Sequence, residues 1–442
     1  MWGGGKWLTM DKVMPGAYHR FVSTPDGTVA VTDRGNAAIG LDLDWGVDSQ
    51  IVEVEAMEFL KNSRNIFGYA YSSKELKPIR EIFKKAKVLY YYRLNGGGEK
   101  ATCKWADAKY TGVRGNALRI AIATALDAEG YFDVETYLDN AKIDSQRVKA
   151  VTELKDTEFV VWKRTAGALA AEAGVSFSGG TNGTANGESH QAFLDKAERV
   201  SFHTLGCNSN DKTTMMLYDS YANRMVDEVG KLFQLVRPAK DSSGAEVKAD
   251  SPNIIVVENK VLDTDAPVYA SIYWVLGASA GCAVNKTLQN AVYDGEYTLD
   301  VDYTQSQLQN FILGGKFAFH EAGKQIRVLD DINSMTTVAE DGQEDFKNNQ
   351  SVRVYYQQLN DINAEFNNFF QGNTPNDQDG RSAFRGRVIN YLDELVKLRA
   401  IEPYDAEDVS VARGLTVKDI DLTFPSQAIN AMHKLYVTVK VS

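Results

Sequence analysis

Alternating apolar and polar positions mark the C-terminal end of the chain. The sequence from Leu435 to Val441 reads Leu-Tyr-Val-Thr-Val-Lys-Val, in strict period two. This alternation of β-branched residues is typical of a half-buried strand. A terminal strand frays unless something pairs with it, and an unpaired edge can recruit another chain. The pattern therefore predicts a strand that pairs with a neighbouring subunit through a face made of Leu435, Val437, Val439 and Val441.

The N-terminal end has a related pattern. Pro15-Gly16 is a turn signal, and residues 17–23 form a short strand candidate before the break at Pro25-Asp26-Gly27. Ahead of it lies a Gly-rich lead, Met1-Trp2-Gly3-Gly4-Gly5-Lys6-Trp7, which carries two tryptophans. Two such ends on a large body predict subunits linked by strand exchange. The N-terminal exchange residues are expected to be Ala17, Tyr18, Phe21 and Val22.

The body of the chain mixes helical and strand periodicities. Helical spacing of apolar residues predicts helices over 75–85, 212–229 and 265–282, and two C-terminal helices with stripes from 352 to 369 and from 384 to 398. Expected strands span 28–33, 37–43, 88–94, 118–124, 131–138, 158–163, 201–205, 233–236, 254–257, 317–320 and 325–329, with final strands from about 409. Strand, helix and strand in this order indicate α/β units.

Two Gly-rich segments, 96–98 and 178–187, enclose a region of short strands. We interpret that region as an inserted mostly-β domain and the second segment as a linker or surface loop. The predicted fold class is α/β (α+β) and multidomain, with strand-exchanging terminal arms. The expected divisions are 1–26, 27–96, 97–186, 187–345 and 346–442.

Composition narrows the class of protein. The 442 residues carry a net charge of −11, which argues against nucleic acid as a partner because phosphate binding needs surplus Lys and Arg. No apolar run approaches the ~20 residues of a membrane span, and the N-terminus lacks a secretory signal. We therefore expect a protein made in a cytoplasm. Cys103, Cys207 and Cys282 are scattered and are expected to be free thiols.

Two patterns resemble ligand sites and fall short of them. Gly179 to Gly183 lacks the Lys-Ser/Thr of a phosphate-binding loop. Four carboxylates have the spacing of calcium-loop positions 1, 3, 7 and 12, but Gly46 and Val47 occupy positions where a ligand and a glycine belong. An exposed turn is the favoured interpretation of that segment. The carboxylates are Asp42, Asp44, Asp48 and Glu53.

Motifs of catalysis are missing from the sequence. The five histidines are scattered, and neither a Gly-x-Ser-x-Gly motif nor a nucleophile motif around a cysteine occurs. We therefore expect no catalytic residue, no cofactor and no metal. A basic cluster on the second C-terminal helix is favoured as a solvated face, with an acidic docking partner as the alternative. Its members are Arg381, Arg385, Arg387, Lys397 and Arg399.

Several segments, in order, resemble the landmarks of a known family. They are 1–7 with 15–18, Leu41-Asp42-Leu43-Asp44-Trp45-Gly46, residues 109–116, residues 178–183 and residues 419–441 with Ile429-Asn430-Ala431-Met432. Through them the whole chain resembles contractile tail sheath proteins, of the type found in phages of Gram-positive bacteria, defective prophages and phage-tail-like bacteriocins. The resemblance gives the calcium-like segment no metal role.

The resemblance implies a structural subunit without enzymatic activity. Such subunits stack as hexameric rings around an inner tail tube, with baseplate and tail terminator proteins as further partners. Their terminal strands complete sheets in neighbouring subunits, and a metastable sleeve contracts by rigid-body rearrangement. The place implied is a virion tail or phage-tail-like particle assembled in the host cytoplasm. With the inserted domain at the periphery, Arg381, Arg385 and Arg399 become the expected tube-facing residues.

Two other hypotheses compete with this one. The first is a static self-assembling tube or shell protein, which would form polymers of one diameter that never shorten. The second is an α/β enzyme whose active site forms only in the folded protein, within residues 187–340. Turnover of substrates would favour the enzyme.

Overall fold

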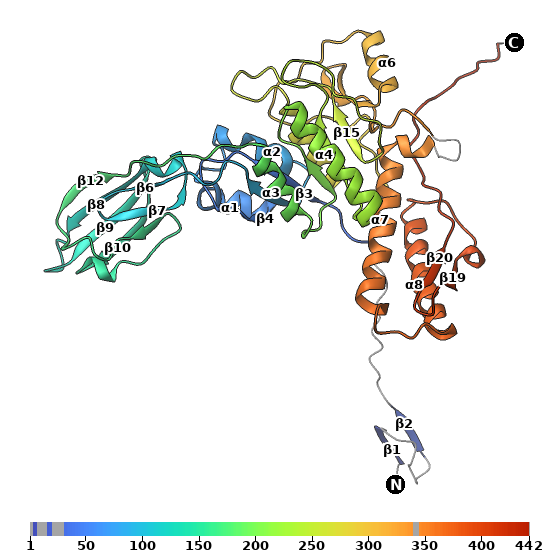
Figure 1. Cartoon of the computed structure of the whole chain (residues 1–442), viewed down its shortest axis with the longest axis horizontal. Coiled ribbons are helices and arrows are strands. Elements are labelled where there is room, and N and C mark those ends of the chain that lie inside the picture. Colours follow the sequence, from blue (N-terminus) through green and yellow to red (C-terminus); the bar gives the residue numbers. More distant parts are fainter. Residues whose placement is uncertain (1–2, 7–15, 20–30, 339–343, 442) are drawn as a thin grey trace. The chain divides into compact units, whose positions relative to one another are not determined.

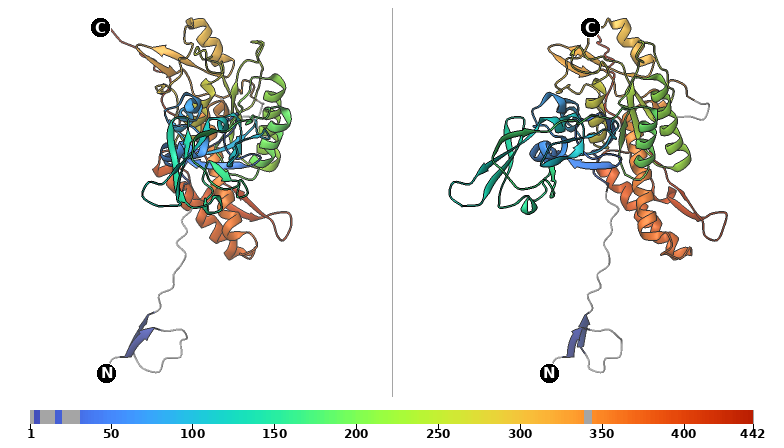
Figure 2. Two further views of the ribbon diagram at one scale, coloured as in Figure 1. Left: turned by 90° about the vertical axis from the view of Figure 1, so that its left-hand side faces the viewer. Right: turned by 60° about the vertical axis from the view of Figure 1, so that its left-hand side comes forward.

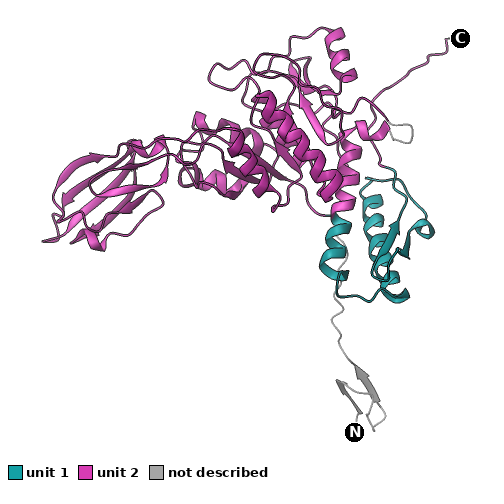
Figure 3. Ribbon diagram, viewed as in Figure 1, with its two compact units in different colours: residues 1–31, 361–427 teal, residues 32–360, 428–442 magenta. Residues whose placement is uncertain are grey.

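A computed structural model of the chain describes residues 3–6, 16–19, 31–338 and 344–441. Figure 1 labels its elements in chain order. The chain divides into two compact units, which Figure 3 colours separately. Unit 1 contains residues 1–31 and 361–427, and unit 2 contains residues 32–360 and 428–442. One unit therefore combines an N-terminal with a C-terminal part of the chain.

A seven-stranded sheet forms the centre of unit 2, and all its neighbouring strands are parallel except the pair at one edge. Near-continuous apolar runs suit strands that helices cover on both faces. The order is β16 (Lys316–Phe317), β15 (Ile254–Val257), β14 (Gln234–Pro238), β13 (Thr204–Gly206), β3 (Asn36–Leu41), β5 (Val88–Arg93) and the antiparallel β4 (Ile51–Glu55).

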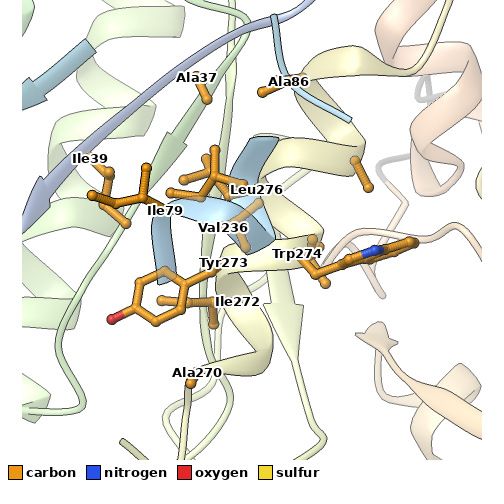
Figure 4. Close-up of a cluster of buried hydrophobic side chains, with 14 of the residues drawn as sticks. Ala37, Ile39, Ile79, Ala86, Val236, Ala270, Ile272, Tyr273, Trp274 and Leu276 are labelled. Atoms are coloured by element: carbon orange, nitrogen blue, oxygen red, sulfur yellow. The ribbon is translucent and has the colours of Figure 1, made fainter. Parts of the chain in front are cut away.

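Helices cover both faces of this sheet. Along β3, the side chains of Ala37, Ile39 and Leu41 enter one buried cluster, and Ala38 enters the other. Figure 4 shows part of the first cluster, where side chains from the strands meet those of α2 and α5. The first face is covered by α1 (Ala56–Phe67), α2 (Lys77–Phe83) and α5 (Ser271–Gly281), and the second by α3 (Gly187–Ala197) and α4 (Lys212–Arg224).

Residues 100–176 form a β-sandwich, which confirms the predicted mostly-β insertion. Its two sheets enclose a core that includes Trp105, Ile120 and Val134. In both views of Figure 2 these teal strands gather into one group. One sheet has the order β10 (Ala141–Val148), β9 (Phe132–Leu138), β8 (Leu118–Thr124) and β12 (Glu172–Ser176), and the other β11 (Val160–Trp162), β7 (Ala106–Thr111) and β6 (Lys100–Thr102).

The rest of unit 2 follows the large sheet. Helix α6 spans Gln305–Leu313, and a hairpin pairs β17 (Phe319–Ala322) with β18 (Gln325–Val328) around Gly323, as the sequence predicts. Helix α7 spans Asn349–Glu365.

In unit 1, the π-helical turn η6 (Phe366–Phe370) precedes helix α8 (Gln378–Lys397). Asp377 caps α8, because its side chain accepts a hydrogen bond from the Gly380 N–H. One stripe of α8 is buried, and the hairpin β19 (Ser410–Arg413) and β20 (Ile420–Thr423) follows it. The buried stripe contains Phe384, Val388, Tyr391, Leu392 and Leu395.

Two element predictions were wrong. Residues 31–33, the described part of the strand expected over 28–33, are not a strand. Helix α5 begins at Ser271 and not at 265, because Pro267 accepts a turn hydrogen bond from the Ala270 N–H just before it. The sequence analysis also missed β4 and α1, which occupy residues 51–67.

Candidate assembly surfaces

The C-terminal tail, residues 429–441, is extended and has no strand partner among the described residues. The apolar side chains at 435, 437, 439 and 441 are between 70% and 92% exposed. Tyr436, on the opposite face, is exposed as well. The half-buried strand that the alternation predicts is therefore not formed within one copy. Pairing of this tail with another copy stays a prediction.

Helix α7 anchors the root of the tail. The Gln350 side chain donates from Nε2 to the Ile429 carbonyl (3.0 Å) and accepts at Oε1 from the Ala431 N–H (3.1 Å). Asn430 Nδ2 donates to Ser351 Oγ at 2.9 Å. Gln350 and Ser351 are buried, so the side chains that hold the tail are themselves fixed in the body of unit 2. The sequence analysis missed these anchors, whose polar side chains carry no motif.

Among the described residues, the last anchor along the tail is a contact between His433 and Asp330, which is an ion pair when the imidazole is protonated. His433 Nε2 lies 3.5 Å from Asp330 Oδ2. Burial raises the pKa of the Asp330 carboxyl, and the charge of His433 opposes that effect. Lys434 to Val441 extend beyond this point.

The hairpin β19–β20 in unit 1 has the same two-faced pattern as the tail. Its antiparallel register sets Val411 opposite Leu422 and Ala412 opposite Asp421. Val411 and Leu422 are half-buried, whereas Ala412 and Asp421 are exposed. In the described part of the chain neither strand has a further neighbour. An isolated two-stranded hairpin is marginally stable, so its edges are suited to accept another strand.

The three arginines expected to face a tube differ in their surroundings. Arg385 Nε donates to the Val409 carbonyl at 2.6 Å, and Arg381 Nη1 donates to the Asn376 backbone and side-chain oxygens, both at 3.0 Å. These two side chains thus stabilise loops within unit 1. Arg399 is exposed at the end of α8.

The N-terminal arm is described in two pieces. Strand β1 (Gly3–Lys6) pairs in parallel with β2 (Gly16–His19), which contains Ala17 and Tyr18. Phe21 and Val22 lie outside the described residues. The exchange role of these four residues therefore stays a prediction.

The calcium-like segment belongs to an arginine-centred network. The Arg93 side chain is fully buried and donates to the Leu43 and Gly46 carbonyls, to Asp48 Oδ1 (3.0 Å) and to Thr111 (3.0 Å). Asp44 accepts from the Tyr69 hydroxyl and from Asn182 Nδ2, both at 2.7 Å.

This network corrects the interpretation of the segment as an exposed turn. Asp44 and Asp48 are half-buried and bind groups of the protein, and Glu53 lies within β4. Desolvation lowers the pKa of Arg93, and the nearby carboxylates oppose that effect. A guanidinium presents five donors in a fixed fork, which suits several oxygens at once.

The two Gly-rich segments pack against each other. The Gly183 N–H donates to the Asn95 carbonyl (3.0 Å), and the Thr181 N–H donates to Glu99 (3.1 Å). A Cβ at Gly98 would lie 2.0 Å from the Thr181 carbonyl oxygen, so these backbones approach too closely for any side chain. Residues 179–186 form neither helix nor strand and join β12 to α3, as predicted for a linker or surface loop, and at 181–183 this loop is packed against residues 95–99.

Comparison with known proteins decides the family. Four profiles of phage tail sheath proteins match consecutive parts of the chain: the Gp18 domain III N-terminal region at 34–94, the beta-sandwich domain at 96–182, the central domain at 183–334 and the C-terminal domain at 341–442. The chain belongs to the phage tail sheath family. The resemblance inferred from the sequence is confirmed, and with it a structural role.

Relatives match over nearly their full length. The chain is 26% identical to the protein YqbK of Bacillus subtilis strain 168, over 98% of both chains. It is 27% identical to the phage-like element PBSX protein XkdK of the same strain, over 99% of this chain and 100% of the relative.

Solved structures of sheath proteins share the fold. The sheath tail protein of Desulfitobacterium hafniense is 28% identical, with a TM-score of 0.78 over 94% of this chain and 100% of that one. The sheath tail protein of Listeria innocua is 25% identical, with a TM-score of 0.76 over 90% and 93%. The anti-feeding prophage helical sheath in its contracted state, at 12% identity and TM-score 0.56 over 97% and 99%, has a similar fold.

Other reactive groups of this sheath protein are buried or dispersed. Burial raises the pKa of the Cys207 and Cys282 thiols, and the pKa of His190 falls to about 4 because its ring is buried. Among the described residues, His, Cys, Asp and Glu side chains form no group that could hold a metal ion. Within the same residues, no helix is both long and apolar enough to cross a membrane.

Proposed function

We propose that the chain is the subunit of a contractile tail sheath. Copies form stacked hexameric rings around an inner tail tube, and contraction of this sleeve drives the tube through a cell envelope. The family membership supports the sheath role, and the likeness to the fold of a contracted sheath is compatible with contraction. In this proposal the protein acts by assembly and rearrangement, without catalysis.

The exposed tail carries this proposal. Added to an edge of the β19–β20 hairpin of a second copy, a strand over 435–441 would continue both of its faces. The apolar face would extend the half-buried face of Val411 and Leu422, and the polar face would extend that of Ala412 and Asp421. Main-chain hydrogen bonds would link the copies, and the alternating side chains would set the register.

Charge favours the same pairing. The tail carries Lys434 and Lys440 and no acidic residue up to Ser442. Residues 361–427, by contrast, carry twelve acidic and seven basic side chains, a net charge of −5. Opposite charges on donor and acceptor steer association between copies and disfavour pairing of acceptor with acceptor.

Further partners follow from the sheath role. We propose the inner tube, the baseplate and a tail terminator protein as neighbours in a virion tail or phage-tail-like particle, assembled in the host cytoplasm. On the tube side, Arg399 is the best candidate of the three arginines because its side chain is exposed. Replacing Arg381 or Arg385 by Glu would also break bonds inside unit 1.

Electron microscopy of tail variants tests the proposal. Val437 and Val439 are 70% and 76% exposed in one copy, so Val437→Asp with Val439→Asp should leave the folded subunit intact. In an exchanged strand these side chains face the acceptor's apolar side. We expect full-length protein to form hollow sleeves and the double variant to remain unassembled at the same concentration.

Thr438→Asn is the control, because residue 438 points to the opposite, polar face and should permit assembly, whereas Val437→Asn with Val439→Asn, which adds no charge, should block assembly like the Asp pair. Removal of residues 1–24 should abolish sleeves as well. Sleeves formed equally by the double variant would contradict tail exchange. Sleeves of one length that never shorten would favour a static tube, and turnover on substrate panels would favour an enzyme.

A further inference from the structure

Unit 1 contains a half-open cavity of 720 Å³ next to the tip of the β19–β20 hairpin. Its floor is aromatic: Phe366 and Phe370 each pack against Phe384, with ring centroids 5.5 and 4.9 Å apart at 62°. Val417 and Ile420 of the hairpin complete the apolar lining. A cavity of this size lies within the range of binding pockets, which is roughly 300–1,000 Å³.

The rim of the cavity is polar and held in place. Asn376 Nδ2 donates to the Val417 and Asp419 carbonyls, at 3.0 and 2.8 Å. Arg381 Nη1 in turn donates to the Asn376 carbonyl at 3.0 Å. The two bonds from Asn376 Nδ2 run from the segment before α8 to the hairpin tip. They fix the opening between these two segments.

An indole fits this arrangement better than an aliphatic side chain. Tilted aromatic pairs leave ring faces and edges available for a further ring, and such contacts are favourable beyond the area they bury. The indole N–H also needs an acceptor when its ring is buried, and the Val417 carbonyl, which accepts one hydrogen bond from Asn376, can accept a second.

The chain itself supplies two indoles that lie outside the described residues. Trp2 and Trp7 directly flank β1 in the Gly-rich N-terminal lead. The segment from Met1 to Lys12 has two lysines and one aspartate, a net charge of +1, against −5 for residues 361–427. Aromatic content and charge thus both match this segment to the cavity.

We propose that the cavity receives a tryptophan of the N-terminal lead, Trp2 or Trp7, from a second copy of the chain. This inference rests on the proposed function, since it makes the lead a second link between sheath subunits. The tail would pair with the hairpin edge, and the lead would insert a side chain beside the hairpin tip. Each copy would then make two different contacts with one acceptor unit: its tail with the hairpin edge and its lead with the cavity.

Site-specific photo-crosslinking tests this assignment. p-Benzoylphenylalanine replaces Val417, which lines the cavity, or Leu415, which is fully exposed in the same turn and does not line it. Each photoreactive chain is assembled with an excess of full-length chain labelled with ¹⁵N. After illumination, mass spectrometry identifies the captured peptide and its isotope.

We expect position 417 to capture the ¹⁵N-labelled peptide 1–6 or 7–12, and position 415 to capture neither. The crosslink should disappear when the labelled chain carries Trp2→Ala and Trp7→Ala, and persist with Trp2→Phe and Trp7→Phe. Capture of the tail peptide, of the unlabelled chain's own lead or of no peptide in polymers that microscopy confirms would overturn the inference while leaving the sheath role intact. Absence of any polymer would contradict both.

Discussion

Arg399 holds a backbone conformation that costs free energy for every residue except glycine. Its φ is +58°, in the left-handed region, directly after α8. The Arg399 N–H donates to Val396 and the Ala400 N–H donates to Leu395, both at 2.9 Å. This pair of bonds is the Schellman ending of a helix, in which glycine usually takes the place of Arg399. Arg399 is therefore less stable at this position than glycine would be.

Arg399→Gly should raise the free energy of unfolding by about 0.5–1 kcal/mol, because glycine adopts positive φ without steric cost. The shift is measured as the change in urea midpoint of unassembled protein. Lys397→Gly is the matched control: it removes the same charge inside the helix and should be destabilising by about 0.5–1 kcal/mol. Equal destabilisation by both changes would contradict the strain at Arg399.

Single residues also show what sequence reasoning could not reach. The carboxylates of the calcium-like segment were recognised as unusual, yet their partner Arg93 lies 45 residues away from Asp48. The spacing of residues along the chain reveals a set of ligands only when all of them lie in one local loop. A buried cation supplied by a distant strand leaves no local pattern.

Helices α3 and α4 pack together around a buried histidine. His190 is buried on α3, and its Nδ1 lies 2.9 Å from the Tyr218 hydroxyl on α4. Burial lowers the pKa of His190 to about 4, from the ordinary value of 6.5. Between these two pH values the unfolded chain binds more protons than the folded chain at this site. Stability is therefore complete above pH 6.5 and falls as the pH drops toward 4.

Replacing His190 by a residue that does not titrate should weaken the pH dependence of stability. Over the full window the shift corresponds to about 3 kcal/mol, since each pKa unit is worth about 1.4 kcal/mol. His190→Gln can keep a hydrogen bond to Tyr218 without titrating near pH 5. We expect its urea midpoint to fall less than that of the natural chain between pH 6.5 and 4.5. Parallel curves for the two proteins would show that His190 does not cause the acid sensitivity.

Elements with a clear period were predictable from the sequence. Strand β8 coincides with the predicted range 118–124, and α8 follows the predicted apolar stripe. Helix α1 was missed: Met57 and Leu60 are exposed whereas Phe59 and Phe67 are buried, and Glu55 before the helix makes no capping side-chain hydrogen bond. The loop of the second Gly-rich segment was predicted, but its close packing against 95–99 was not, because close backbone packing and flexibility both favour glycine.

At the scale of the molecule, Arg93 closes the junction between the β-sandwich and the α/β part of unit 2. Its partners come from the loop after β3, from the end of β7 and, through Asn182, from the segment between β12 and α3. Removing one partner of a buried charge pair leaves the other uncompensated, which typically costs about 3–5 kcal/mol.

Arg93→Met should therefore be destabilising by a similar amount and should open the junction. Hydrogen exchange at the Thr181 and Gly183 amides is expected to accelerate, whereas amides of β8 and β9 should change little. Arg147→Met is the control, because Arg147 pairs with Asp127 and Asp133 at the exposed surface, where solvent screening leaves such pairs little effect on stability. Unchanged exchange at 181 and 183 would show that Arg93 does not hold the junction.

The clamp on the tail has a geometric consequence for any lattice. The Ala431 backbone is fixed to α7, and four residue steps separate it from Leu435, the first position of the proposed exchanged strand. At about 3.3 Å per residue, that leash reaches at most roughly 13 Å, and less when the His433–Asp330 contact holds. If the tail pairs as proposed, the receiving hairpin of one copy stays within that radius of the donor's α7, whether the sleeve is long or short. Under that proposal a rearrangement pivots about this point, because the leash is too short to let neighbours slide past each other.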